Sequence, residues 1–242
     1  MTTLYACYFG SGLRDQWPRM ARVLAVTAAQ SCPTWTVQVE VIAHPSPRPR
    51  VSEGYVSNTH KLDRWCAVAA AAPDGTPLLL IDADTMILRP LDPVWDLAFD
   101  VAYTIRPASS RFPLNAGVIF LRVSDRSRAF LLAWRDENRQ MLKDAARHQP
   151  WRKRYGGMNQ AALGAVLASS HAADLVIARL PCAEWNCEDS TWPAFDPAVT
   201  RILHIKSQLR LAVFHGVSGV SRWKKLVALW RARELEAWVR LT

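Results

Sequence analysis

The sequence has no stretch that approaches the roughly 20 apolar residues of a membrane-spanning helix. It has no C-x-x-C spacing, and its five cysteines are odd in number, which favours a reduced, cytoplasmic chain over a disulfide framework. Residues 1–5 lack the basic region of a signal peptide, so we expect no secretory leader. There is also no internal repeat and no linker that would divide the chain.

What is abundant is apolar and basic. Hydrophobic residues make up 50% of the 242 residues, and Trp occurs 11 times, so a large packed core is expected. The formal net charge is +9. This charge implies an anionic partner such as a nucleotide, a nucleic acid or a lipid surface, although general solubility explains the same count.

Residues 77–90 (PLLLIDADTMILRP) contain the pattern around which the rest of the chain is organised. The apolar run 78–81 predicts a strand buried on both faces at the centre of an α/β sheet. Asp82 and Asp84 follow, and carboxylates at i and i+2 of an extended chain point to the same side. Open α/β sheets bind ligands there, and two neighbouring carboxylates are costly without a cation. A divalent metal explains the pair; two turn residues closing a strand are the alternative.

Strand and helix patterns alternate along the chain. Apolar patterns predict strands over 3–9, 35–43, 78–81, 100–105, 118–123, 174–180 and 200–206. Helices are expected over about 15–28, 60–72, 124–144, 157–168 and 222–241. The segments between them, which include 44–58, 106–114, 147–154 and 181–197, are expected to be loops. The alternation indicates an α/β fold with a mainly parallel central sheet flanked by helices.

Six segments match motifs of one known family in the expected order. They are residues 7–10 (CYFG), 78–88 (LLLIDADTMIL), 115–121 (NAGVIFL), 159–163 (NQAAL), 180–186 (LPCAEWN) and 203–206 (LHIK). On these motifs the chain resembles the GT-A fold nucleotide-sugar glycosyltransferases, and most of all family 8, which includes glycogenin and bacterial lipopolysaccharide galactosyltransferases. The resemblance implies a Rossmann-like catalytic domain over 1–220, with a basic amphipathic helix over 221–242 that is part of it or appended to it.

The resemblance also implies a function and a set of site residues. The enzyme would be a metal-dependent hexosyltransferase, retaining the anomeric configuration. It would use UDP-glucose or UDP-galactose and an acceptor that the sequence does not identify, a cell-surface glycan being one option. Mn²⁺, with Mg²⁺ as the alternative, would be held by Asp82, Asp84 and His204. The donor would be bound by Tyr8, Phe9, Gly10, Lys61, Asp82, Ala83, Asn115, Ala116, Lys206 and Arg210. The catalytic residues would be Asp84, Asn159 and Gln160.

The chain departs from the family at two points. Asn159 stands where the family has Asp, so a contact with a sugar hydroxyl loses its charge. The family's Lys-Pro-Trp after the histidine is absent, and Arg210 and Lys206 are two candidates for the phosphate-binding cation. Each of four candidate site residues could instead have a purely structural role. Lys61 could be a solvated lysine, Asn115 a turn residue, Asn159 a helix cap and His204 a histidine whose hydrogen bonds are made within the sheet.

The last helix pattern has two interpretations. It carries six basic residues against two acidic ones, and a rough apolar stripe of Trp223, Leu226, Val227, Trp230 and Trp238. Such a helix could place a cytoplasmic protein on the inner face of a membrane, whereas packing on the core is the favoured alternative.

Other features admit other function classes. Trp185, Asn186 and Trp192 are candidates for acceptor contact, with core packing as the alternative. A haloacid-dehalogenase-type phosphatase also has Asp-x-Asp after a strand, but Met86 stands where that pattern has Thr or Val. A basic nucleic-acid-binding protein is suggested by 147–157 (RHQPWRKRYGG). We expect no nucleic-acid partner, because an acidic pair suits a phosphate-bridging metal better.

Overall fold

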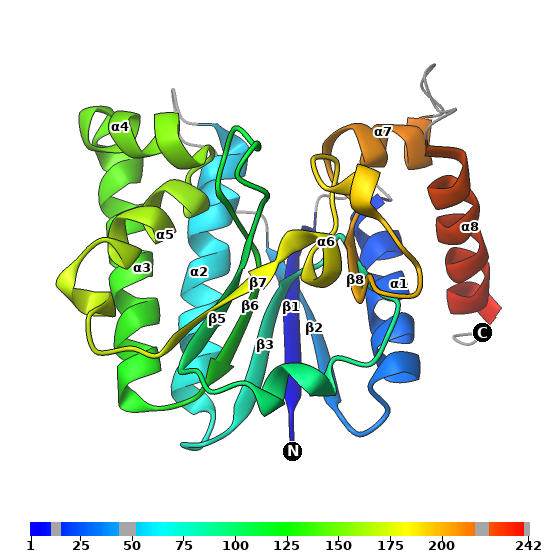
Figure 1. Cartoon of the computed structure of the whole chain (residues 1–242), viewed down its shortest axis with the longest axis horizontal. Coiled ribbons are helices and arrows are strands. Elements are labelled where there is room, and N and C mark those ends of the chain that lie inside the picture. The colour runs from blue at the N-terminus through cyan, green and yellow to red at the C-terminus, as the bar shows by residue number, and fades with distance from the viewer. Residues whose placement is uncertain (11–15, 44–51, 216–222, 240–242) are drawn as a thin grey trace.

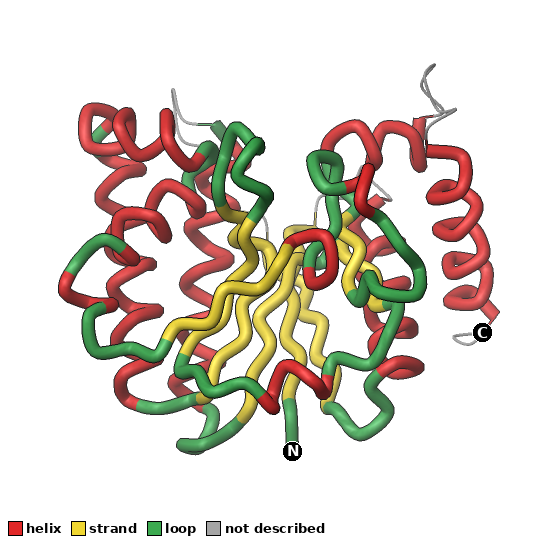
Figure 2. Tube along the Cα trace, in the orientation of Figure 1, coloured by secondary structure: helices red, strands yellow, loops and turns green. Residues whose placement is uncertain are grey.

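A computed structural model describes residues 1–10, 16–43, 52–215 and 223–239 of the chain (Figures 1 and 2). Six strands form one sheet, in the order β2 (Thr36–Ala43), β1 (Thr3–Gly10), β3 (Pro77–Asp82), β6 (Leu114–Arg122), β5 (Val101–Ile105) and β7 (Ile177–Pro181). The mainly parallel sheet is confirmed, although β6 runs antiparallel to both β3 and β5. Two short strands, β4 (Thr85–Ile87) and β8 (Ile202–His204), form a separate antiparallel pair.

Helices cover both faces of the sheet (Figure 1). On one side lie α2 (Glu53–Ala71), α3 (Asp125–Lys143), α4 (Ala145–Tyr155) and α5 (Asn159–Leu167). On the other lie α1 (Gln16–Ser31), α7 (Ser207–His215) and α8 (Lys224–Val239). The connections contain the short helix α6 (Cys182–Trp185) and 3₁₀ turns at Asp92–Asp96, Ser170–Ala172 and Trp192–Ala194.

Strand β3 is buried on both faces, as its apolar run predicts. Leu78 and Leu80 pack in a core with α2 and α3, whereas Leu79 and Ile81 pack in a second core that includes α1. All four side chains are fully buried. The central strand is therefore fixed from both sides, and its carboxyl end holds the acidic pair at a defined place.

Two expected loops are helical. Helix α2 begins at Glu53, seven residues before the expected start, while 44–51 lie outside the described residues. The segment 147–154 belongs to α4, because the Asp144 carboxylate accepts hydrogen bonds from the first backbone N–H groups and Gly156, at φ 71°, ends the helix. Helix α7 was not expected, and the proposed cap Asp15 of α1 lies outside the described part of the chain.

The apolar stripe of α8 faces the protein. Trp223, Leu226, Val227 and Trp230 are buried in a third core shared with α1 and α7, and Glu234 forms an ion pair with Arg19. Trp238, the last residue of the stripe, is 48% exposed, so the stripe is covered except at the end of the helix. Among the described helices, none is both long and apolar enough to cross a bilayer.

Candidate metal and nucleotide-sugar site

Asp82 is the last residue of β3 and Asp84 lies in the tight turn between β3 and β4, so the pair does not share one extended segment as the sequence pattern predicts. The Asp82 carbonyl accepts a hydrogen bond from the Thr85 hydroxyl (2.7 Å), and the Asp84 carbonyl accepts one from the Ile205 backbone N–H (2.7 Å). Strand β4 then pairs with β8 in a register that sets Thr85 opposite His204. The small second sheet thus carries a histidine from late in the chain to the acidic pair.

The three predicted ligands converge. One ligand atom from each of Asp82, Asp84 and His204 lies within 4.8 Å of the other two. The His204 Nε2 atom is 3.2 Å from Asp84 Oδ1 and 3.7 Å from Asp82 Oδ2. Among the described residues, this is the one group of three or more His, Cys, Asp or Glu side chains with such spacing.

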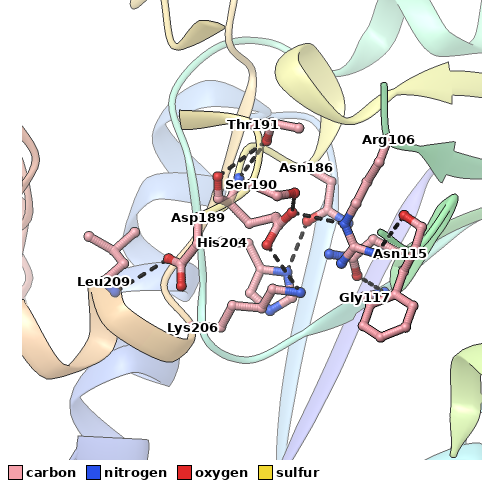
Figure 3. Close-up of polar contacts among 12 residues, drawn as sticks. Arg106, Asn115, Gly117, Asn186, Asp189, Ser190, Thr191, His204, Lys206 and Leu209 are labelled. Carbon is pink, nitrogen blue, oxygen red and sulfur yellow. Dashed lines mark hydrogen bonds and ion pairs between the residues drawn. The ribbon is translucent and has the colours of Figure 1, made fainter. Parts of the chain in front are cut away.

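A buried hydrogen-bond relay fixes the orientation of His204 (Figure 3). Its Nδ1 lies 2.9 Å from the Asn186 Oδ1 atom, and the Asn186 Nδ2 group donates to the Thr104 hydroxyl (2.9 Å). That hydroxyl donates in turn to the Asn115 carbonyl (2.9 Å). The relay leaves Nδ1 as the donor toward Asn186, so Nε2 points at the carboxylates. The Nε2 atom and the two carboxylates are therefore placed so that one cation could contact all three groups.

Gly117 of β6 allows this close approach. A Cβ atom there would lie 2.6 Å from His204 Cε1 and 2.7 Å from Asp82 Oδ2. The family-like Asn-x-Gly motif therefore has a steric reason in this chain. Only a residue without a side chain leaves room for the imidazole and the carboxylate.

Two cations neutralise the aspartates. Lys61 pairs with Asp82, and the Arg210 guanidinium pairs with Asp84 while lying over the Trp17 ring at 4.6 Å. Burial raises the pKa of the Asp84 carboxyl, but the electrostatic interactions with His204 and Arg210 outweigh this and hold the pKa well below its usual range. Lys61 is 8% exposed, so the solvated-lysine alternative is wrong, and it lies inside α2 rather than at a helix start.

A cavity of about 670 Å³ opens over this centre, at the carboxyl ends of the parallel strands. It is lined by the expected residues Tyr8, Phe9, Lys61, Asp82, Ala83, Asp84, Asn115, Ala116, Asn159, Gln160, His204, Lys206 and Arg210. Gly10 does not line it, because it ends β1 opposite Ala43 of the edge strand β2. Lining residues not foreseen include Trp17, Ser57, Asn58 and Met158.

Two buried carboxamides on the cavity wall have an unpaired donor. Asn115 Oδ1 accepts from the Gly117 N–H (2.9 Å), and Asn159 Oδ1 accepts from Asn138 (3.0 Å). The Nδ2 groups of Asn115 and Asn159 have no hydrogen-bond partner among the described residues. An unmade bond of this kind costs roughly 1–3 kcal/mol, which a ligand oxygen would recover. Beside them, Gln160 Nε2 donates to the Tyr155 carbonyl (2.8 Å).

Lys206 is held at the cavity by an ion-pair network (Figure 3). Its Nζ lies 3.4 Å from Glu188 Oε2, and Arg106 Nε lies 2.9 Å from Glu188 Oε1. Burial raises the pKa of Glu188, but Lys206 and Arg106 more than offset that effect and lower it to about 2. The charged Glu188 therefore fixes the position of Lys206, one of the two candidates for the phosphate-binding cation.

Of the aromatic candidates for acceptor contact, Trp185 is buried and Trp192 is partly buried against the core. Trp185 is 6% exposed and meets the Phe120 ring edge-on, and Trp192 stacks on Phe195 at 4.5 Å. Asn186 is fully buried in the relay to His204. For these three residues the core-packing alternative describes the structure.

No protein-family model matches the chain, and no curated protein matches it. Among solved structures, a glycosyltransferase involved in glycosylation of the major capsid of PBCV-1 is 13% identical, with a TM-score of 0.59 over 87% of this chain and 96% of that one. The galactosyltransferase LgtC, in complex with donor and acceptor sugar analogs, is 12% identical, with a TM-score of 0.52 over 96% and 100%.

A third solved structure extends the likeness. The glycosyltransferase GlyE of Streptococcus pneumoniae TIGR4 is 12% identical, with a TM-score of 0.60 over 98% of this chain and 63% of that one. The chain therefore has the GT-A fold of nucleotide-sugar glycosyltransferases, as its resemblance to family 8 predicts.

Proposed function

We propose that the chain transfers a hexose from a UDP-sugar, UDP-glucose or UDP-galactose, in a reaction that depends on a divalent cation. The observation that carries the proposal is the convergence of Asp82, Asp84 and His204 within 4.8 Å beneath a cavity at the carboxyl ends of the parallel strands. The three solved structures similar to this chain are glycosyltransferases, and one was solved with donor and acceptor sugar analogs.

The residues present fit a metal. Two carboxylates and one imidazole suit Mn²⁺, with Mg²⁺ as the alternative, and the relay from Asn186 supplies the outer support that metal-bound imidazoles have in proteins. A bound divalent cation supplies Lewis-acid neutralisation of the diphosphate. Asp82, Asp84 and His204 would hold it, and Gly117 would keep the space clear.

The remaining residues bind and orient the donor. Lys206 and Arg210 would face the phosphates, where their charge favours departure of UDP. The unpaired Nδ2 groups of Asn115 and Asn159 would bind sugar hydroxyls. Gln160 directs its Nε2 group to the Tyr155 carbonyl, which leaves Oε1 for the reacting carbon. Tyr8 and Phe9 would contact the uridine, and retention of configuration follows from the family resemblance.

A thermal-shift panel tests the donor and the metal together. We expect UDP-glucose or UDP-galactose to stabilise the chain only with Mn²⁺, by about 2.7 kcal/mol at a hundredfold excess over Kd. The Asp84→Asn variant keeps the side-chain size but should lose this shift and donor hydrolysis. Asp74→Asn is the matched control, because Asp74 pairs with Arg128 at the opposite end of β3. Equal shifts in both variants would remove Asp84 from the site.

Location and membrane contact also belong to this proposal. The five cysteines are buried free thiols, which suits the cytoplasm. Helix α8 leaves only Leu235, Trp238 and Val239 as exposed large apolar residues. We therefore expect little flotation with anionic liposomes, and no change in Leu235→Asp. Flotation that Leu235→Asp abolishes would instead place the chain on the inner membrane face through this edge.

A further inference from the structure

A second, basic cavity lies beside the first. It has a volume of about 480 Å³ and forms where the β5–β6 loop meets α4 and the first turn of α2. Figure 1 shows this loop rising next to α4 at the upper edge of the sheet. The side chains that line the second cavity are those of Tyr55, Arg111, Phe112, Gln149, Arg152 and Lys153. Gly157 lines both cavities, so the second one borders the place proposed for the donor.

The cations of this cavity have no ion-pair partner among the described residues. Arg111, Arg152 and Lys153 have no carboxylate within ion-pair distance in the part of the chain that the structure describes, and no Asp or Glu lines the cavity. By contrast, Arg147 on the same helix is paired with Glu137 (2.5 Å). The three side chains are exposed and line one hollow, so an anionic ligand could reach all of them.

Two aromatic rings at the cavity hold two of its arginines through cation–π contacts. The Arg111 guanidinium lies 5.0 Å from the Phe112 ring centroid, and that of Arg152 lies 5.9 Å from the Tyr55 ring centroid. These contacts orient the cations without neutralising them. Gln149 adds an uncharged hydrogen-bonding group. A hollow of this volume suits one or two sugar units better than a polymer that must run across the surface.

We propose that this cavity binds an acceptor that carries an anionic group, a phosphorylated or carboxylate-bearing sugar, and presents it to the donor site across Gly157. The inference rests on the proposed function, because only a sugar donor in the first cavity makes the second one an acceptor site. The arginines would bind the anion through charge-assisted hydrogen bonds, and Gln149 would bind a sugar hydroxyl.

Calorimetry on the full chain tests this assignment. The chain is first loaded with UDP and Mn²⁺, so that the donor cavity is filled, and then titrated with glucose 6-phosphate or with glucose. We expect the phosphate ester to bind roughly ten- to a hundredfold more tightly than glucose. Arg152→Gln and Lys153→Gln should each lose at least about fivefold of that affinity. Arg154→Gln, an exposed neighbour on α4 that does not line the cavity, should lose none.

Four results would overturn the proposal. They are equal affinity for glucose and glucose 6-phosphate, an equal loss in Arg154→Gln, binding of inorganic phosphate as tight as that of the ester, and tighter binding of single-stranded DNA that the same variants lose. The last would assign the cavity to nucleic acid. Failure of the proposed function is distinguishable, because it appears in the loading step as no heat from UDP and Mn²⁺. The Arg152→Gln and Arg154→Gln comparison on unloaded chain then still tests the cavity.

Discussion

Replacing Gly117 with Ala tests the metal centre from its steric side. The added Cβ would lie 2.6 Å from His204 Cε1 and 2.7 Å from Asp82 Oδ2. Ordinary van der Waals contact of a Cβ atom begins near 3.4 Å, so the imidazole and the carboxylate must each move away from the added Cβ by roughly 0.7–0.8 Å. The strand backbone itself tolerates Ala, because Gly117 lies within β6 and does not have a positive φ. The strain therefore falls on the two ligands.

The expected magnitude follows from that displacement. Overpacking should cost about 1–3 kcal/mol of unfolding free energy, which leaves the fold intact. Disturbance of ligand placement should weaken Mn²⁺ binding by roughly 10- to 100-fold, and sugar transfer should fall on the order of 100-fold. Calorimetry with Mn²⁺ in the presence of UDP measures the affinity, and chemical unfolding measures the stability.

Gly164→Ala is the matched control. A Cβ at Gly164 would overlap the Tyr155 ring, so this variant also overpacks a buried site, but it touches no metal ligand. We expect a similar loss of stability and unchanged Mn²⁺ affinity. If Gly117→Ala bound Mn²⁺ as tightly as the wild type, or if both variants lost affinity equally, the reasoning about the centre would be refuted.

Two further predictions concern the supporting network. Asn186→Leu removes the acceptor for His204 Nδ1 and should weaken Mn²⁺ binding by roughly 10- to 100-fold while UDP binding without metal changes little; equal losses in both titrations would contradict it. Lys206 and Arg106 lower the pKa of Glu188 to about 2, against the effect of burial. The charged form of Glu188 therefore stabilises the fold above about pH 4.5, and this contribution disappears as the pH falls toward 2. The unfolding free energy of Glu188→Gln should therefore lie at most about 3 kcal/mol below the wild type at pH 7, with the gap closing below pH 4.5; a gap independent of pH would refute the assignment.

The part of the site that the sequence predicts is the part fixed by a local pattern. The run Leu78–Leu80 with Ile81 demands burial on both faces, so β3 and the acidic pair at its end could be placed from the residues alone. The reversed direction of β6 could not, because strand pairing is set by contacts far apart in the sequence. The pairing of Thr85 with His204 has the same origin, and the family resemblance indicated only that His204 joins the acidic pair.

Local sequence patterns also failed to predict helix α4 and the environments of Trp185 and Asn186. The segment around Pro150 looked like a loop, yet capping at both ends of α4 outweighs one proline inside it. Trp185 looked available for a sugar, yet the fold turns it onto Phe120. Asn186 stood within a recognised motif, but its role depends on a relay through Thr104 that no sequence spacing reveals. Buried polar residues that orient a site residue, such as Asn186, could not be predicted from the sequence.

Pulsed electron paramagnetic resonance of Mn²⁺ bound to the full chain with UDP tests most directly whether Asp82, Asp84 and His204 hold one metal ion. The geometry of Asp82, Asp84 and His204 predicts nitrogen coupling from one imidazole. That coupling should vanish in His204→Gln, which retains a polar side chain in β8. A spectrum of the wild type without nitrogen coupling, or the same coupling in His204→Gln, would contradict the site.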